Sequence, residues 1–290
     1  MNRPDILLVY KRSAYARYRQ KFPLAAIRGP LRLVLKASHA RHQDALLRVG
    51  SILESRGYRL YRSFRSDLSR VRDLDRRFAL VVTVGGDGTF LEASHALFRT
   101  PILGVNSDPE KSVARFSACD VDALDDLLDR YRAGLVRPVS LARLRLRLDG
   151  KTLPFAALND VLVTARCPAE ASRYTLKVGT IREEQMSSGL WISTAVGSTA
   201  ANASAGGRVL PHGCRCFQYV VREVYHRKTG RRRLLKGILR AGKIVILSHM
   251  RDGEIYVDGA NLRIPFGLGS RLEVSLSNRP LKVVGLRKCR

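Results

Sequence analysis

The feature that most constrains the fold is a buried strand followed at once by a glycine-rich turn. Residues 79–84 (ALVVTV) form a continuous apolar run, which is typical of a strand covered on both faces. The sequence GGDGT follows at 85–89, then a stretch of helical character over 90–98 and a second apolar run over 101–105. Strand, turn, helix and strand in this order predict a right-handed βαβ unit on a parallel sheet.

The turn at 85–89 has the composition of a phosphate-binding loop. Three glycines at the carboxyl end of a parallel strand let backbone N–H groups approach a phosphate, and the helix that follows presents its positive end. Neither GxxxxGK[ST] nor GxGxxG occurs there, so the turn is neither a Walker loop nor a Rossmann fingerprint. A turn of purely steric origin is the alternative.

Asp87 is the residue of this turn that points to chemistry. A carboxylate beside a phosphate is repulsive unless it binds Mg²⁺ or accepts a proton. Its presence therefore favours phosphoryl transfer with Asp87 as the general base. The alternative from local sequence is that Asp87 caps the following helix.

The N-terminal part continues the α/β pattern. Residues 5–10 (DILLVY) predict a strand, and 38–57 predict a helix that Ser38 caps and Gly57 ends. A further helix is expected over 121–131. The segment 11–36 contains no acidic residue and has repeated Arg with interleaved Tyr, which indicates either a solvated basic loop or a loop that attracts phosphates.

After Val136 the sequence pattern changes from the α/β type to one typical of antiparallel strands. Residues 144–148 (LRLRL) alternate apolar and polar side chains, and Asp-Gly pairs at 149–150, 252–253 and 258–259 are hairpin signals. The second half is therefore expected to be β-rich and antiparallel. We predict an α/β domain over 1–137, a β-rich domain over 138–280 and a C-terminal segment over 281–290 that returns to the first domain.

Two further blocks in the second half have residues suited to a nucleoside. Residues 187–207 (SSGLWISTAVGSTAANASAGG) surround a short strand and a small-residue helix over 198–205 with hydroxyls and glycines, although tight packing would need the same residues. Asn159 and Asp160 stand at the head of an apolar strand. The amide suits a base edge and the carboxylate suits ribose hydroxyls, whereas a simple turn is the alternative.

Charge and cysteine content limit the possible partners and compartment. The 290 residues include 52 Lys+Arg against 25 Asp+Glu, a net charge of +27 that implies an anionic partner, while 45% hydrophobic residues exclude a disordered basic tail. We find no membrane-spanning run and no secretory signal, so a cytoplasmic protein is expected. Five scattered cysteines indicate reduced thiols. His212, Cys214 and Cys216 lack zinc-site spacing, so no metal site is expected.

In combination, these blocks resemble the NAD kinase family, which phosphorylates the adenosine 2′-hydroxyl of NAD. GGDGT at 85–89 resembles the first family motif, GVN at 104–106 the next strand end, and Asn159-Asp160 the family's Asn-Glu pair. GSTA at 197–200 with SAGG at 204–207 resembles its glycine- and serine-rich block, and Asp258-Gly259 its late turn. The resemblance covers the chain from about Ala79 onward.

Departures from the usual family pattern indicate a divergent branch. Ser188 stands where an acidic residue is usual, Ala201 where Tyr is usual, Asp160 where Glu is usual, and SVARF at 112–116 where an LGFL-like sequence is usual. Together with NSDP at 106–109, these changes resemble the branch that includes plant NADH kinase and the mitochondrial NAD kinase of animals. Members of that branch can favour NADH over NAD.

The resemblance also implies roles for residues. Asp87 would accept the proton of the 2′-hydroxyl. Mg²⁺ would arrive with the donor, ATP, for which inorganic polyphosphate is the alternative. Homodimers or homotetramers are implied, as is an N-terminal α/β domain followed by an antiparallel β-rich domain. The residues expected to bind the nucleotides are Gly85, Gly86, Gly88, Thr89, Asn159, Asp160, Ser188, Ser198 and Thr199.

Two other functions fit part of the sequence. A diacylglycerol-type lipid kinase would share the GGDGT block but not the blocks around Asn159 and Gly197. A protein that binds nucleic acid or another polyanion without catalysis would explain the charge, but no recognisable reading motif occurs. For the kinase, the basic segments 11–36 and 227–243 provide a hypothesis of electrostatic attraction of the anionic substrates.

Overall fold

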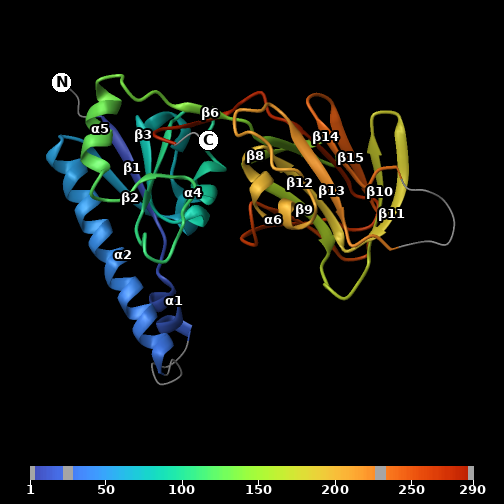
Figure 1. Cartoon of the computed structure of the whole chain (residues 1–290), viewed down its shortest axis with the longest axis horizontal. Helices are drawn as coiled ribbons and strands as arrows, with labels where there is room; N and C mark the ends of the chain where they lie inside the picture. Colours follow the sequence, from blue (N-terminus) through green and yellow to red (C-terminus); the bar gives the residue numbers. More distant parts are fainter. Residues whose placement is uncertain (1–3, 22–28, 226–232, 287–290) are drawn as a thin grey trace. The chain divides into compact units, whose positions relative to one another are not determined.

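The computed structural model of the chain describes residues 4–21, 29–225 and 233–286. The chain divides into two compact units (Figure 1). The first consists of the described residues of Met1–Val139 and Leu281–Arg287, and the second of those of Ser140–Pro280. Each unit is built around its own sheets and its own hydrophobic core.

The first unit contains a largely parallel sheet. Within the described residues it has seven strands in the order β2-β1-β3-β4-β19-β6, and β5 pairs with β4. Neighbours among the first four strands are parallel, and β19 is parallel to β4. The strands are β1 (Asp5–Tyr10), β2 (Arg59–Phe64), β3 (Leu80–Gly85), β4 (Ile102–Asn106), β5 (Ser117–Cys119), β6 (Val139–Leu141) and β19 (Leu281–Val283).

Helices cover both faces of this sheet. They are α1 (Ala14–Lys21), α2 (Pro30–Ser55), the 3-10 helix η2 (Arg65–Arg70), α3 (Leu74–Arg77), α4 (Asp87–Ser94) and α5 (Leu124–Arg132). Val49 and Leu53 of α2 pack with Leu8 and Val82 on one face. On the other face, α4 lies over β3, so the predicted βαβ unit is confirmed as β3-α4-β4. The predicted strand over 5–10 is confirmed as β1.

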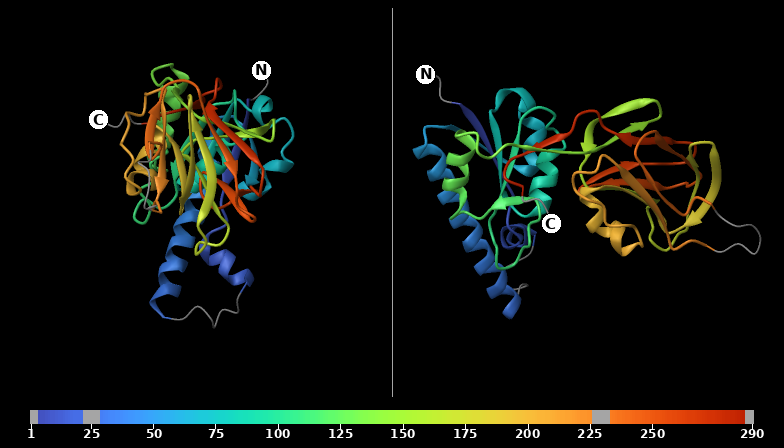
Figure 2. Two further views of the ribbon diagram at one scale, coloured as in Figure 1. Left: turned by 90° about the vertical axis from the view of Figure 1, so that its right-hand side faces the viewer. Right: turned by 45° about the horizontal axis from the view of Figure 1, so that its top comes forward.

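The long helix α2 starts earlier than the sequence pattern predicts. It begins at Pro30, because proline fits the first turn of a helix, so the predicted start at Ser38 is wrong. Ser38 lies inside α2, and its hydroxyl donates to Asp108 Oδ2 at 2.6 Å. The basic segment 11–36 is largely helical rather than a loop, with α1 beside α2 in Figure 2; its residues 22–28 lie outside the described residues.

The second unit is antiparallel and consists, within the described residues, of two six-stranded sheets. Their orders are β11-β10-β15-β18-β7-β8 and β14-β13-β12-β9-β16-β17. Its strands are β7 (Leu144–Leu148), β8 (Lys151–Ala157), β9 (Asp160–Ala165), β10 (Ser172–Val178), β11 (Ile181–Ser187), β12 (Gly189–Thr194), β13 (Phe217–Arg222), β14 (Lys236–Leu239), β15 (Lys243–Ser248), β16 (Gly253–Val257), β17 (Leu262–Pro265) and β18 (Arg271–Leu276).

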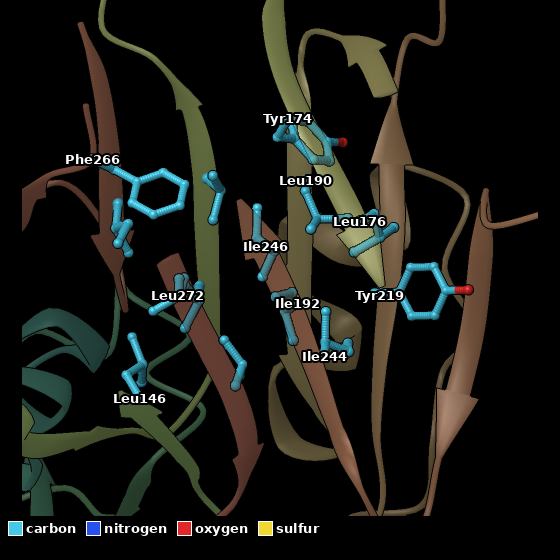
Figure 3. Packing of buried hydrophobic residues seen from close by; sticks show 14 of the residues in the cluster. Leu146, Tyr174, Leu176, Leu190, Ile192, Tyr219, Ile244, Ile246, Phe266 and Leu272 are labelled. Carbon is cyan, nitrogen blue, oxygen red and sulfur yellow. The ribbon is translucent and has the colours of Figure 1, made fainter. Parts of the chain in front are cut away.

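The two sheets of the second unit share one core. Side chains of Leu146, Tyr174 and Ile246 from one sheet pack with Leu190 and Ile192 from the other (Figure 3). Alternate residues of each strand point into this core, which is why the strands alternate apolar and polar side chains. The predicted fold class, an α/β unit followed by an antiparallel β-rich unit, is confirmed.

Two of the three Asp-Gly hairpin signals are confirmed. Asp149 and Gly150 both have positive φ in the turn between β7 and β8, and the loop from Asp258 connects β16 with β17. The pair at 252–253 is different, because β15 and β16 belong to different sheets. The predicted small-residue helix over 198–205 is divided into two short helices, the 3-10 helix η3 (Val196–Thr199) and α6 (Ala201–Ser204).

Among the described residues, no helix is both long and apolar enough to cross a membrane.

Candidate functional site

In the first unit, the GGDGT turn lies where β3 ends and α4 begins. Gly85 is the last residue of β3, Gly86 occupies the N-cap position and Asp87 is the first residue of α4. A Cβ at Gly85 would lie 2.5 Å from Thr89 Oγ1, so the turn needs glycine there. The Thr89 hydroxyl is buried and makes no hydrogen bond within the described part of the chain. A polar atom in that state is suited to a ligand that supplies the missing partner.

Asp87 is half-buried and is not the cap residue, so the capping interpretation is wrong. Its carboxylate Oδ1 accepts a hydrogen bond from the backbone N–H of Phe116 at 2.9 Å. The Phe116 ring stacks on Phe90 of α4, with centroids 5.0 Å apart, and this stacking fixes the position of the donor. The carboxylate is therefore held as an acceptor beside the glycine turn.

The segment after β4 forms a polar network with α2. Asp108 is buried and accepts hydrogen bonds from Ser38 at 2.6 Å and Arg41 Nε at 2.7 Å. Burial raises the pKa of Asp108, but these bonds outweigh that effect and the pKa is lowered overall. Asn106 donates from Nδ2 to the Ser112 carbonyl at 2.8 Å, and a Cβ at Gly86 would lie 2.9 Å from Ser112 Oγ. The network therefore reaches the glycine turn.

His42 of α2 belongs to the same network and is 1% exposed. Its Nε2 lies 2.9 Å from the Lys11 carbonyl, which can only accept, so Nε2 is the protonated nitrogen. Nδ1 then accepts from the Ser107 hydroxyl at 2.9 Å. Burial lowers the pKa of His42 to about 4, so the imidazole is neutral at pH 7. His42 could not be identified from the sequence, because its partners are 31 and 65 residues away.

In the second unit, Asn159 and Asp160 stand at the head of β9, beside the end of β16. The carboxylate of Asp258 accepts from the N–H groups of Leu158, Asn159 and Asp160 at 2.8, 2.7 and 3.0 Å. Asp258 adopts positive φ, which turns its side chain back toward this segment. From the sequence, Asp258 was recognised only as a turn residue. Its structural part is to fix the backbone of the Asn-Asp pair.

Three polar residues adjoin one another here, Asn159 and Asp160 in sequence and Ser193 across the sheet from Asp160. Asp160 is 6% exposed, and burial together with the nearby Asp258 raises its pKa to about 7. Ser193 of β12 pairs with Asp160 across the sheet. Asn159 Oδ1 and Ser193 Oγ are buried without a hydrogen-bond partner in the described residues. The amide, carboxyl and hydroxyl groups of these residues can both donate to and accept from the hydroxyl groups of a ligand.

The glycine- and serine-rich block packs on this cluster. Gly197 lies against the main chain of Asn159, and Thr194 donates from Oγ1 to the Leu158 carbonyl at 2.6 Å. The hydroxyl of Ser198 donates to the Ala195 carbonyl at 2.6 Å and accepts from the Leu210 N–H at 2.9 Å. Thr199 follows and is half-buried. The Ser198 hydroxyl therefore makes both of these hydrogen bonds to the protein's own main chain.

The predicted site residues are distributed between the units. Gly85, Gly86, Asp87, Gly88 and Thr89 belong to the first unit, and the others belong to the second. Asn159, Asp160, Ser198 and Thr199 lie at one end of β12. Ser188 precedes the opposite end, where its N–H donates to the Arg222 carbonyl, about 17 Å along the strand from Ser193.

The cysteine expectation needs one correction. Cys214 and Cys216 form a disulfide, so reduced thiols were wrongly predicted for them. Their Cα atoms are 5.3 Å apart, within the range that a disulfide can bridge. Cys119 and Cys167 are not part of a disulfide, and Cys289 lies outside the described residues. In the described residues, no group of three or more His, Cys, Asp or Glu is placed to hold a metal ion.

Comparison with known proteins identifies the family. Residues 26–133 match the family model described as the ATP-NAD kinase N-terminal domain. A probable NADH kinase of Oryza sativa subsp. japonica is 33% identical over 267 residues, which cover 84% of this chain and 81% of that protein. The chain belongs to the NAD kinase family. An NADH kinase of Arabidopsis thaliana is also 33% identical, over 81% of this member of the family and 80% of the plant protein.

Solved structures share the fold of this NAD kinase family member. An NAD kinase from Archaeoglobus fulgidus in complex with ATP aligns with a TM-score of 0.68 and 19% identity, covering 98% of this chain and 94% of that one. Yeast NADH kinase complexed with NADH aligns with a TM-score of 0.69 and 15% identity, covering 99% of this chain and 85% of the yeast chain. The resemblance and fold class predicted from the sequence are therefore confirmed.

Proposed function

We propose that this protein is an NAD(H) kinase. It transfers a phosphoryl group from ATP to the 2′-hydroxyl of the adenosine ribose of NAD or NADH and produces NADP(H). The observation that carries the proposal is the 33% identity to a probable NADH kinase over 84% of the chain. The retained Asp87, held beside the glycine turn by Phe116, supplies a base of the kind that this reaction needs.

The predicted site residues of the first unit have proposed parts in the transfer. The carboxylate of Asp87 accepts the proton of the 2′-hydroxyl as the oxygen attacks the γ-phosphorus, and ADP leaves. The N–H groups of the glycine turn and the Thr89 hydroxyl bind phosphate oxygens. Mg²⁺ enters as part of the substrate Mg²⁺-ATP, in which it neutralises charge on the phosphates.

The second unit is proposed to bind the adenosine. Asn159 offers an amide to the base, and Asp160 binds ribose hydroxyls. With a pKa of about 7, Asp160 can donate or accept at physiological pH. The backbone that presents both residues is fixed by Asp258. Thr199 lines the adenosine pocket, Ser198 supports it through Leu210, and Ser188 takes part in nicotinamide binding.

Three further aspects are proposals. Homo-oligomeric assembly as a dimer or tetramer rests on the family resemblance alone. A cytoplasmic location and action of the two units as domains with boundaries near residues 137 and 280 rest on the sequence pattern. Electrostatic attraction of anionic substrates by the basic segments also remains a proposal. Residues 22–28 and 227–232 of those segments lie outside the described residues.

The test is a coupled assay of purified protein with Mg²⁺-ATP. NAD and NADH are offered separately, and NADP or NADPH is detected. We expect turnover with at least one dinucleotide, and the ratio of the two rates gives the preference between NAD and NADH. Replacing ATP by inorganic polyphosphate identifies the donor. Absence of product from every pair would contradict the proposed function.

A further inference from the structure

Three residues at the carboxyl edge of the parallel sheet stand in one row. In the register of the strands, Tyr10 pairs with Phe64 on one side and with Val84 on the other. The residues that follow these pairs are Arg65 after β2, Lys11 after β1 and Gly85, the last residue of β3, so Lys11 lies between Arg65 and Gly85. Adjacent strands are about 4.8 Å apart. Two cationic residues, Lys11 and Arg65, thus follow the ends of the strands next to the start of the glycine turn.

Arg65 is directed toward that turn by a contact with α4. Its Nε lies 3.0 Å from Glu92 Oε2, and both side chains are largely shielded, with 21% and 26% exposed. A Cβ at Gly88 would lie 3.2 Å from Arg65 Nη1. The guanidinium group therefore lies over the first turn of α4, where backbone N–H groups have no partners within the helix.

Lys11 is fixed at the same edge by a contact of its main chain with His42 of α2. Its carbonyl accepts the Nε2–H of His42, and Nδ1 of the same ring accepts from Ser107 after β4. The lysine is half-buried, and burial together with the nearby Arg65 lowers its pKa. Glu92 pairs with Arg65, and Asp108 offsets part of the effect on Lys11. Both cations nevertheless lie next to the glycine turn, where their side chains are suited to the phosphate groups of a ligand.

A cavity of about 550 Å³ lies on the β2 side of this row. It is lined by side chains of β1, β2, η2 and the segment that leads to β3, among them Tyr61, Phe64, Arg72 and Arg77. Its size is in the range of small-molecule sites. Arg77 stacks on the Tyr61 ring at 4.1 Å, so the lining combines aromatic surface with positive charge. A nucleoside polyphosphate has both complementary parts.

We propose that Lys11 and Arg65 bind the phosphate groups of the ATP donor, whose nucleoside extends toward this cavity. His42 is then a positioning residue for Lys11. The inference rests on the proposed function, but it assigns the donor to residues outside the GGDGT turn. The unpaired hydroxyl of Thr89 is an independent sign of a ligand at the same turn.

The experiment compares Lys11→Met and Arg65→Gln with wild-type protein. KM is measured for ATP at saturating NADH and for NADH at saturating ATP. We expect KM for ATP to rise about 10- to 100-fold in each variant, because a charge-assisted contact to phosphate is lost, while KM for NADH stays within about twofold. The assignment would be overturned if the variants had the same KM for ATP as wild type, or if KM for NADH rose instead.

Control variants separate this contact from general charge and from folding. Lys151→Met and Arg99→Gln remove the same charges from exposed positions outside the two basic segments, and both KM values should stay within about twofold. A similar rise in these controls would indicate long-range attraction instead. Glu92→Gln removes the ion-pair partner of Arg65 but leaves the positive charge of Arg65 in place. If it matched Arg65→Gln, the role of Arg65 would be structural.

A binding measurement distinguishes failure of the inference from failure of the proposed function. The increase in Tm caused by Mg²⁺-ATP is recorded for wild type and both variants. We expect wild type to be stabilised and each variant to lose more than half of the shift, whatever the acceptor substrate is. A full shift in both variants would contradict the donor site even if no dinucleotide is phosphorylated.

Discussion

Gly197 packs directly on the main chain of Asn159. A Cβ at Gly197 would lie 2.1 Å from the Asn159 carbonyl oxygen and 2.6 Å from its Cα. The Asn159 carbonyl also accepts the N–H of Thr194 at 2.9 Å, so the backbone there has no room to move away. Two sequence blocks 38 residues apart are thereby joined into one structure that presents Asn159 and Asp160.

Gly197→Ala should destabilise the second unit strongly. The added methyl group overlaps backbone atoms, which cannot rotate aside as a side chain can, so we expect a loss of about 2–3 kcal/mol in the free energy of unfolding. Chemical denaturation measures it. Gly213→Ala is the control, because a Cβ there meets nothing within 4 Å, and it should be near neutral. Equal stability of the two variants would contradict the packing.

Asp160→Asn should stabilise the protein at high pH and weaken binding of the dinucleotide. The pKa of Asp160 is about 7 in the folded protein, above the value of an unfolded Asp, so its stabilising contribution is full below pH 4 and is lost as pH rises to 7. At pH 8 the buried charged carboxylate lowers the stability of the wild type by up to about 4 kcal/mol, and the variant has no such charge.

Two measurements check the Asp160 prediction. Tm of the variant should exceed that of wild type at pH 8, and the gap should close toward pH 4. KM for NADH should rise about tenfold, in line with loss of a charged hydrogen-bond partner. A lower Tm at pH 8 would contradict the raised pKa, and an unchanged KM would remove Asp160 from the binding site.

His42 should make stability fall in mild acid. Its folded pKa of about 4 lies below the unfolded value of 6.5, so the neutral ring stabilises fully above pH 6.5 and the contribution declines as pH falls to 4. The decline amounts to about 3 kcal/mol. Unfolding free energies of wild type and His42→Gln at pH 7.5 and 4.5 measure it. The variant should have a shallower pH dependence, and an identical one would refute the assignment.

Parts of the fold could be predicted because the signal was local. The apolar run before Gly85 and the alternation over 144–148 each determine an element from a few adjacent residues. The Asp149-Gly150 turn has the same character, because both residues tolerate the positive φ that it requires. In the site, Asp87 was identifiable for the same reason, since it lies within a continuous motif.

Other parts could not be predicted because the determining contact is distant in sequence. Ser38 has the chemistry of a cap, but Asp108, 70 residues away, uses its hydroxyl inside a helix. The apolar side chains of Leu31 and Leu33 are exposed, so no periodicity indicated the first turns of α2. His42 and the carboxylate of Asp258 act on backbone groups of remote segments, which composition does not reveal.

The most direct test of the central claim is the turnover of Asp87→Asn. The exchange keeps the shape of the side chain and removes the base, so we expect kcat for NADP(H) formation to fall by about 10²- to 10⁴-fold, with Tm close to that of wild type. Asp126→Asn, at an exposed position of α5, is the control and should retain full activity. A folded Asp87→Asn protein with near-normal kcat would contradict the account.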